Sequence, residues 1–238
     1  MNKRDKIIPN HTSEEYKMEI LRHKEIDYVI RRPENKVDGE KYPLVIYVHG
    51  AGGRGRDISL IKNHCFFGHS APFLKEAISV APQCYANSWF DIFEQLQDFI
   101  EFVISDKAVD RERVYLMGAS MGGYTTWQLG MTRPELFAAL VPICGGGMYW
   151  NAGRLVNTAI WAFHGDSDPT VFPEESKKFI NNITAWGGEK AKLTILENTG
   201  HNAWEPAFTN PEMWKWLFEQ KNTYEPTENK YDDVKKFG

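Results

Sequence analysis

The stretch Arg113-Val-Tyr-Leu-Met-Gly-Ala-Ser-Met-Gly-Gly123 decides how this chain folds. A mostly apolar run leads into Gly118, Ser120 and Gly122, which form the pattern G-x-S-x-G, and residues 124–131 then read as a helix. A strand, a sharp turn and a helix therefore meet at the serine. Small residues two positions before and after the serine allow such a turn to close without collisions. The segment predicts a nucleophile elbow, in which a serine hydroxyl is presented at a helix N-terminus.

Strands and helices alternate on both sides of this segment. Apolar runs predict strands at 26–30, 43–48, 77–81, 113–117, 138–143, 158–163 and 192–196. Amphipathic spacing predicts helices at 87–104, 124–131, 173–186 and 211–220. The run 43–48 is apolar without interruption, which is typical of a strand buried on both faces of a parallel sheet. The alternation predicts an α/β fold, with a mostly parallel sheet and helices on both faces.

The length of 238 residues is compatible with one α/β domain. We expect this domain to span residues 26–220, after an N-terminal arm or short helix at 1–25 and before a polar C-terminal tail at 221–238. The longest interval without an assigned element is 54–75, so no separate lid domain is predicted.

Composition and charge exclude several classes of protein. The net charge is −4, from 28 basic and 32 acidic residues, so no basic field exists to bind nucleic acid. No apolar run approaches the roughly 20 residues of a membrane span. A charged N-terminus without an apolar core predicts no signal peptide and a cytoplasmic location, although a mature secreted form would have the same pattern. The 3 cysteines are interpreted as buried thiols, because an odd, sparse set is no disulfide framework.

A serine nucleophile needs a base, because its hydroxyl is barely ionised at neutral pH. The chain order expected for this type of elbow is serine, acid, histidine. Of the 7 histidines, only His164 and His201 follow Ser120. No acid at a strand end separates His164 from Ser120, whereas His201 follows a strand and a Thr-Gly turn. His201 is therefore the candidate base.

The acid of such a triad orients the imidazole and stabilises its charged form. Three acidic residues lie at strand ends between Ser120 and His201, namely Asp166, Asp168 and Glu197. Asp168 is favoured because it lies just past a strand, before a proline, in a loop that can reach the end of the next strand. Asp166 is its main rival, and both could instead cap their loop.

An oxyanion hole requires two backbone N–H groups where negative charge develops. We expect one from Met121, after the nucleophile, and the other from the glycine-rich loop 49–55. Ala51 is the favoured donor in that loop and Gly52 is the alternative. We expect His49 to support the loop without transferring a proton. The loop lacks the spacing of a phosphate-binding loop, so no nucleotide site is predicted.

No metal or cofactor is predicted. Neither H-E-x-x-H nor paired C-x-x-C spacing occurs. His64, Cys65 and His69 are close in sequence, but three donors in one loop without a fourth are a weak metal signal.

Taken together, these motifs resemble those of the α/β-hydrolase superfamily. Within it the chain is similar to the small "predicted peptidase" or phospholipase/carboxylesterase-like esterases, which are related to polyhydroxybutyrate-depolymerase-like and feruloyl-type esterases and to the catalytic domain of prolyl oligopeptidases. The resemblance rests on residues 42–55, 80–84, 118–127, 141–147 with 160–169, and 200–204. Gly53 and Thr170 depart from the pattern, since relatives often carry an acidic and an aliphatic residue there.

The resemblance implies an α/β-hydrolase fold with a triad of Ser120, Asp168 and His201. It also implies that Gln83, Trp89 and Trp204 lie near the substrate cleft. The expected function is a serine carboxylic-ester hydrolase acting through an acyl-enzyme on a small-molecule ester, with acetyl or aromatic acyl groups on carbohydrate as examples. The alternatives are a serine peptidase or amidase with the same triad, and a non-catalytic ligand-binding protein on a hydrolase scaffold. The sequence does not define the oligomeric state.

Overall fold

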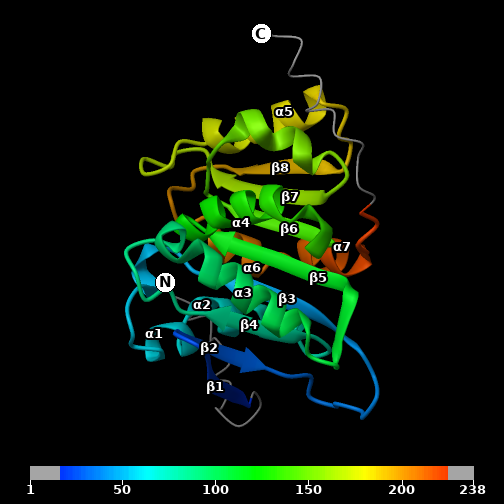
Figure 1. The fold of residues 1–238 in the computed structure, drawn as a ribbon. Helices are drawn as coiled ribbons and strands as arrows, with labels where there is room; N and C mark the ends of the chain where they lie inside the picture. Colours follow the sequence, from blue (N-terminus) through cyan, green and yellow to red (C-terminus); the bar gives the residue numbers. More distant parts are fainter. Residues whose placement is uncertain (1–16, 225–238) are drawn as a thin grey trace, which may run out of the picture.

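The computed structural model describes residues 17–224 and shows one sheet of eight strands (Figure 1). The strands are β1 (Met18–His23), β2 (Ile26–Arg31), β3 (Tyr42–Val48), β4 (Ile78–Pro82), β5 (Val109–Ala119), β6 (Ala139–Ile143), β7 (Ala159–Gly165) and β8 (Ala191–Leu196). Their order across the sheet is β1-β2-β4-β3-β5-β6-β7-β8. Strands β3 to β8 run parallel, and β2 pairs antiparallel with both β1 and β4. The predicted α/β class with a mostly parallel sheet is confirmed.

Helices cover both faces of the sheet, as predicted (Figure 1). The α-helices are α1 (Ser59–Lys62), α2 (Cys65–Ser70), α3 (Phe93–Ile104), α4 (Met121–Thr132), α5 (Glu174–Ala185), α6 (Trp204–Phe208) and α7 (Pro211–Glu219). Short 3-10 turns occur at η1 (Ala51–Gly53), η2 (Ala71–Phe73), η3 (Trp89–Ile92), η4 (Pro134–Leu136) and η5 (Tyr149–Leu155). Helices α3, α4 and α5 lie over one face, and α2, α6 and α7 lie over the other.

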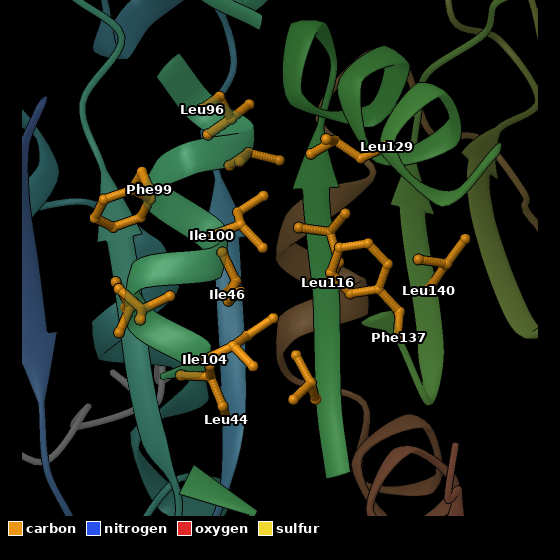
Figure 2. Close-up of a cluster of buried hydrophobic side chains, with 14 of the residues drawn as sticks. Leu44, Ile46, Leu96, Phe99, Ile100, Ile104, Leu116, Leu129, Phe137 and Leu140 are labelled. Atoms are coloured by element: carbon orange, nitrogen blue, oxygen red, sulfur yellow. The ribbon is translucent and has the colours of Figure 1, made fainter. Parts of the chain in front are cut away.

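Strand β3 shows why the sheet needs cover on both faces. All of its residues are buried, and successive side chains point to opposite faces. Leu44 and Ile46 belong to one apolar cluster, where they pack beneath α3 (Figure 2), and Val45 and Tyr47 belong to the other. Burial of one such side chain is worth about 1.5–3 kcal/mol. The uninterrupted apolar run therefore places β3 at the centre of the molecule.

The structure differs from the sequence prediction at the N-terminal edge. The segment 1–25 was expected to be an arm or a short helix, but its described part contains β1, which pairs with β2 along its whole length. This edge strand is only partly buried, so it lacks the apolar run that identifies the central strands. Residues 1–16 lie outside the described part of the chain.

Three further helices lie in segments without a predicted element. Helices α1 and α2 occupy the interval 54–75, and α6 follows the β8 loop. They are 4, 6 and 5 residues long, too short to show helical periodicity. At the C-terminal end, the first residues of the predicted tail pack on the domain, because the Asn222 N–H donates to the Glu112 carbonyl at 2.8 Å. Residues 225–238 lie outside the described part.

Across residues 17–224, no helix has both the length and the apolar character needed to cross a membrane.

Candidate active site

Ser120 lies in a strained turn between β5 and α4. Its φ of 55° and ψ of −118° are rarely adopted by a residue with a side chain. The two glycines of the motif explain how the turn closes. A Cβ on Gly118 would lie 2.2 Å from the Gly122 carbonyl oxygen, and one on Gly122 would lie 1.9 Å from the Val48 carbonyl oxygen. Only glycine fits at either position, so the sequence pattern produces the predicted elbow.

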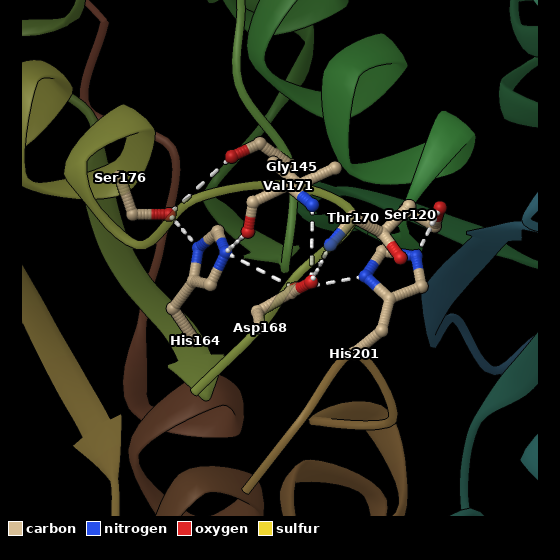
Figure 3. A network of polar contacts seen from close by, with 8 residues as sticks. All are labelled: Ser120, Gly145, His164, Asp168, Thr170, Val171, Ser176 and His201. Carbon is tan, nitrogen blue, oxygen red and sulfur yellow. Dashed lines mark hydrogen bonds and ion pairs between the residues drawn. The ribbon is translucent and has the colours of Figure 1, made fainter. Parts of the chain in front are cut away.

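Ser120, His201 and Asp168 form a continuous hydrogen-bonded chain (Figure 3). The Ser120 hydroxyl lies 2.7 Å from His201 Nε2, and His201 Nδ1 lies 2.7 Å from Asp168 Oδ2. Since a carboxylate only accepts, Nδ1–H donates to Asp168 and Nε2 accepts from the serine. This is the geometry of a serine nucleophile, a general base and an orienting acid. The structure thus brings together the three residues that the sequence selected.

Asp168 is held by its own loop. Its Oδ1 accepts hydrogen bonds from the backbone N–H groups of Thr170 at 2.8 Å and Val171 at 3.0 Å, while its side chain is buried. Burial raises the pKa of this carboxyl, but the hydrogen bonds from His201, Val171 and Thr170 outweigh burial and the pKa is lowered overall. Asp168 is therefore anionic at neutral pH and can stabilise a charged imidazole.

The rival acids have other surroundings. Asp166 accepts from the backbone N–H groups of Asn198 and Thr199, at 3.1 and 3.3 Å, and from the Ser167 hydroxyl. Its pKa is lowered, chiefly by the Ser167 hydroxyl and next by the Asn198 N–H. Glu197 is exposed in the loop after β8. Asp166 thus caps its loop, which was the alternative to its being the catalytic acid.

The two segments predicted to form the oxyanion hole meet beside Ser120. Ala51 is the first residue of η1 and Met121 the first of α4. The first N–H groups of a helix have no acceptor within that helix, so they are available to a ligand. A Cβ on Gly50 would lie 3.4 Å from the Ser120 Cβ, which shows how closely the loop approaches the elbow. The roles of Ala51 and Met121 as donors remain predictions.

His49 supports the glycine-rich loop through hydrogen bonds, as expected. Its Nδ1–H donates to the Gly50 carbonyl at 2.6 Å, and its Nε2 accepts from the Cys84 N–H at 3.0 Å. Burial lowers the pKa of His49 to about 4, so the ring is neutral at pH 7. Both ring nitrogens are already hydrogen-bonded to backbone groups, so His49 has none free for a substrate.

Of the three residues expected near the cleft, only Trp204 lines it. Its ring packs edge-on against His201, with centroids 5.6 Å apart. Gln83 is buried beneath the loop, where its side-chain amide donates to the Gly53 and Asp57 carbonyls. Trp89 is also buried, and its indole N–H donates to the His49 carbonyl at 3.0 Å. The expectation for Gln83 and Trp89 is corrected: both support the loop instead of lining the cavity.

A cavity of about 530 Å³ opens at Ser120 and His201. Four lining residues were not predicted from the sequence: Tyr47, Leu60, His64 and Thr170. The His64 Nδ1 accepts from the Phe66 N–H, so its Nε2–H is directed at the Tyr47 hydroxyl, 3.5 Å away. His64 appeared in the sequence only as a weak metal candidate, and Thr170 only as a departure from a family pattern. The cavity is largely apolar in character, with this polar pair, Ser120 and His201 in its wall.

The described residues contain one cluster of three side chains that could ligate a metal, Cys144, Asp168 and His201. Two of these belong to the hydrogen-bonded triad. Burial raises the pKa of the Cys144 thiol to about 12, so the sulfur stays protonated and is a poor ligand. The cluster is therefore better explained by the triad than by a metal.

The sequence matches known proteins over parts of its length. The sequence pattern of the prolyl oligopeptidase family matches residues 87–152, which include Ser120. A probable feruloyl esterase C of Aspergillus terreus is 27% identical over 66% of this chain and 61% of its own length. The corresponding protein of Aspergillus niger is 24% identical over 75% of this chain and 68% of its own length.

Solved structures resemble this chain in fold. A thermostable esterase is 32% identical, with a TM-score of 0.77 over 87% of this chain and 63% of that protein. A ferulic acid esterase is 15% identical, with a TM-score of 0.66 over 85% of this chain and 96% of that one. The chain has the α/β-hydrolase fold. It is distantly homologous to feruloyl esterases and to the thermostable esterase, and it spans less than two thirds of the length of the Aspergillus terreus relative and of the thermostable esterase.

Proposed function

We propose that this protein is a serine carboxylic-ester hydrolase. The observation that carries the proposal is the chain of two 2.7 Å contacts from the Ser120 hydroxyl through His201 to Asp168, at the wall of a cavity of about 530 Å³. That volume lies within the usual range of about 300–1,000 Å³ for small-molecule sites. The esterase relatives support the same reaction class.

The reaction follows from the roles of the three groups. His201 takes the hydroxyl proton at Nε2 while Ser120 Oγ attacks the ester carbonyl carbon. The backbone N–H groups of Met121 and Ala51 hold the resulting oxyanion. The C–O bond to the alcohol then breaks, and His201 returns the proton to the departing oxygen. Water, activated by His201 in turn, attacks the acyl-enzyme and releases the acid.

We propose an acyl group of small or aromatic type, with carbohydrate esters as one natural form. The cavity walls support this assignment, because Leu60 offers apolar surface and Trp204 offers aromatic surface beside His201. The feruloyl esterase relatives point to the same class of acyl group. A flat aromatic acyl group would gain stacking or edge contacts with Trp204 worth about 0.5–1.5 kcal/mol beyond its buried area.

The test is hydrolysis of an aryl acetate and of methyl ferulate by the wild-type protein, Ser120→Ala and Ser105→Ala. Ser105 is exposed at the end of α3, so its variant is a matched control. We expect Ser120→Ala to lose at least about 1,000-fold in kcat, because the nucleophile is gone. Ser105→Ala should keep wild-type turnover. Equal turnover by Ser120→Ala would exclude the proposed mechanism.

A peptidase or amidase is the second candidate, favoured by the match of residues 87–152 to the prolyl oligopeptidase family. An amide has a poorer leaving group than an ester, so it needs more precise protonation by His201. A matched ester and anilide that share one acyl group separate the two functions. We expect the ester to be cleaved far faster, and equal kcat/KM for the two would favour the peptidase.

A further inference from the structure

A second histidine lies behind Asp168, on the side away from His201 (Figure 3). His164, near the end of β7, has no exposed surface. Its Nε2 lies 2.8 Å from the Val171 carbonyl oxygen and 3.4 Å from Asp168 Oδ2. Its Nδ1 lies 2.7 Å from the Ser176 hydroxyl of α5. The proposed reaction does not use this residue.

The partners of His164 define its protonation. A carbonyl can only accept, so the proton is on Nε2, and Nδ1 accepts from the Ser176 hydroxyl. Burial lowers the pKa of His164, and the ring is therefore neutral at pH 7. Its Nε2–H is thus directed at the Val171 carbonyl, with the Asp168 carboxylate as a longer second acceptor.

These contacts hold the loop from Asp168 to Val171 in place. Val171 donates its N–H to Asp168 Oδ1 at 3.0 Å and accepts from His164 at its carbonyl, so both sides of its backbone are fixed. Asp168 Oδ2 then has the short contact to His201 and the longer one to His164. The carboxylate is held between two imidazoles.

We propose that His164 is a positioning residue for ester hydrolysis. Its Nε2–H fixes the loop from Asp168 to Val171 and so keeps Asp168 Oδ2 aimed at His201 Nδ1. The inference rests on the proposed function, since it assigns His164 to the same triad. A protonated His164 would compete with His201 for Asp168, so the buried neutral form is part of this arrangement.

Other titratable groups face this site and belong to the interpretation of any pH profile. Asp168 and His201 interact directly with the ring. Glu174 of α5 also interacts with His164. Tyr124 of α4 and Cys144 after β6 interact with Asp168, and Glu175 of α5 interacts with Tyr124. Of these groups, only Asp168 has a polar contact with His164 within the described residues, so Val171, Ser176 and Asp168 are the partners to test.

The experiment compares His164→Gln, His164→Leu and Ser176→Ala, with His23→Leu as the control on β1. A glutamine can place an N–H near the Nε2 position, whereas leucine cannot. Turnover is measured per active site, by titration with a fluorophosphonate, across the pH range. We expect His164→Leu to lower kcat about 10- to 100-fold with KM within about threefold, as small misplacements of catalytic groups do. The acid limb of kcat/KM should move to lower pH, because a displaced Asp168 stabilises the charged base less.

His164→Gln should keep kcat within about threefold of wild type, and Ser176→Ala should fall between the two. Wild-type kcat per site in His164→Leu would overturn the proposal, and so would equal losses in the leucine and glutamine variants. If His164→Leu does not fold, Ser176→Ala decides, and wild-type behaviour of that variant would overturn the proposal.

If the wild type has no turnover, the proposed function fails. The downfield proton resonance of His201 Nδ1–H, weakened in the leucine but not the glutamine variant, then still tests the positioning.

Discussion

Ser120 has a backbone conformation that costs about 1–3 kcal/mol, and the surrounding structure holds it there. Its N–H donates to the Ile143 carbonyl at 2.9 Å, and Gly118 and Gly122 let neighbouring backbones approach. Strain of this kind persists only where other contacts impose it, and it often marks a functional site. The proposed chemistry depends on single atoms: the Ser120 hydroxyl oxygen, the two ring nitrogens of His201 and one carboxylate oxygen of Asp168.

The first prediction concerns Trp204, which lines the cavity and packs edge-on against His201. Trp204→Ala should raise KM for methyl ferulate about tenfold, and for an aryl acetate by less, because only the aromatic acyl group loses a ring contact. Trp150→Ala is the matched control, since Trp150 is 64% exposed and does not line the cavity. Equal effects of Trp204→Ala on both esters would show that Trp204 does not recognise the acyl group.

The triad residues were predictable because each carries a local signal: a motif for Ser120, a strand end for Asp168 and the chain order for His201. The buried placement of Gln83 and Trp89 was not predictable, because a resemblance to a family indicates which segment lies near a site but not where a side chain points. Both instead donate to backbone carbonyls under the glycine-rich loop. His64 was missed as a cavity residue for a related reason, since its place depends on how α2 packs on Tyr47.

At the scale of elements, the site is built from segments that follow parallel strands. Loops after β3, β5, β7 and β8 supply Ala51, Ser120, Asp168 and His201. The carboxyl ends of parallel strands share one edge of the sheet, so these loops meet there. Helix α4 packs close enough to β3 that only glycine fits at 122.

The second prediction tests that close packing. Gly122→Ala would place a Cβ 1.9 Å from the Val48 carbonyl oxygen, a contact the backbone cannot accommodate without moving. We expect a loss of at least about 3 kcal/mol in the free energy of unfolding, or no folded protein. Urea unfolding measures the change. Gly68→Ala in α2 is the control, because its Cβ would meet nothing within 4 Å, and it should be neutral or stabilising by up to about 1 kcal/mol.

Central strands were predictable from the sequence because full burial demands continuous apolar residues, as in β3. Edge strand β1 was not, since half of it faces solvent and its pairing with β2 depends on position in the sheet. The start of β5 was missed for a similar reason. Its residues 110–112 are charged and not buried, so the sequence prediction began only at Arg113.

At the scale of the whole molecule, three histidines couple folding to pH: His49 and His164 are buried and His64 is half-buried. Burial lowers the pKa of His49 to about 4 and also lowers the pKa values of His64 and His164. An unfolded histidine has a pKa near 6.5, so below that pH the unfolded chain binds more protons than the folded one. The stabilisation is present above about pH 6.5 and is lost as the pH falls toward the folded pKa values.

The third prediction concerns how the free energy of unfolding depends on pH. The free energy of unfolding should fall between pH 7 and pH 4.5, and His49 alone should account for up to about 3 kcal/mol by pH 4. His49→Gln should unfold more easily at pH 7 but depend less on pH. Urea unfolding at several pH values measures both. An unchanged slope in His49→Gln would contradict this prediction.

Labelling with a fluorophosphonate, followed by peptide mapping, tests whether Ser120 belongs to an assembled acyl-transfer site. Such a probe reacts with a serine that has both a base and an oxyanion hole around it. We predict one adduct, on Ser120, that is lost in His201→Ala and retained in Ser105→Ala. A folded wild-type protein that forms no adduct, or forms it equally well without His201, would contradict the account and favour a binding protein on a hydrolase scaffold.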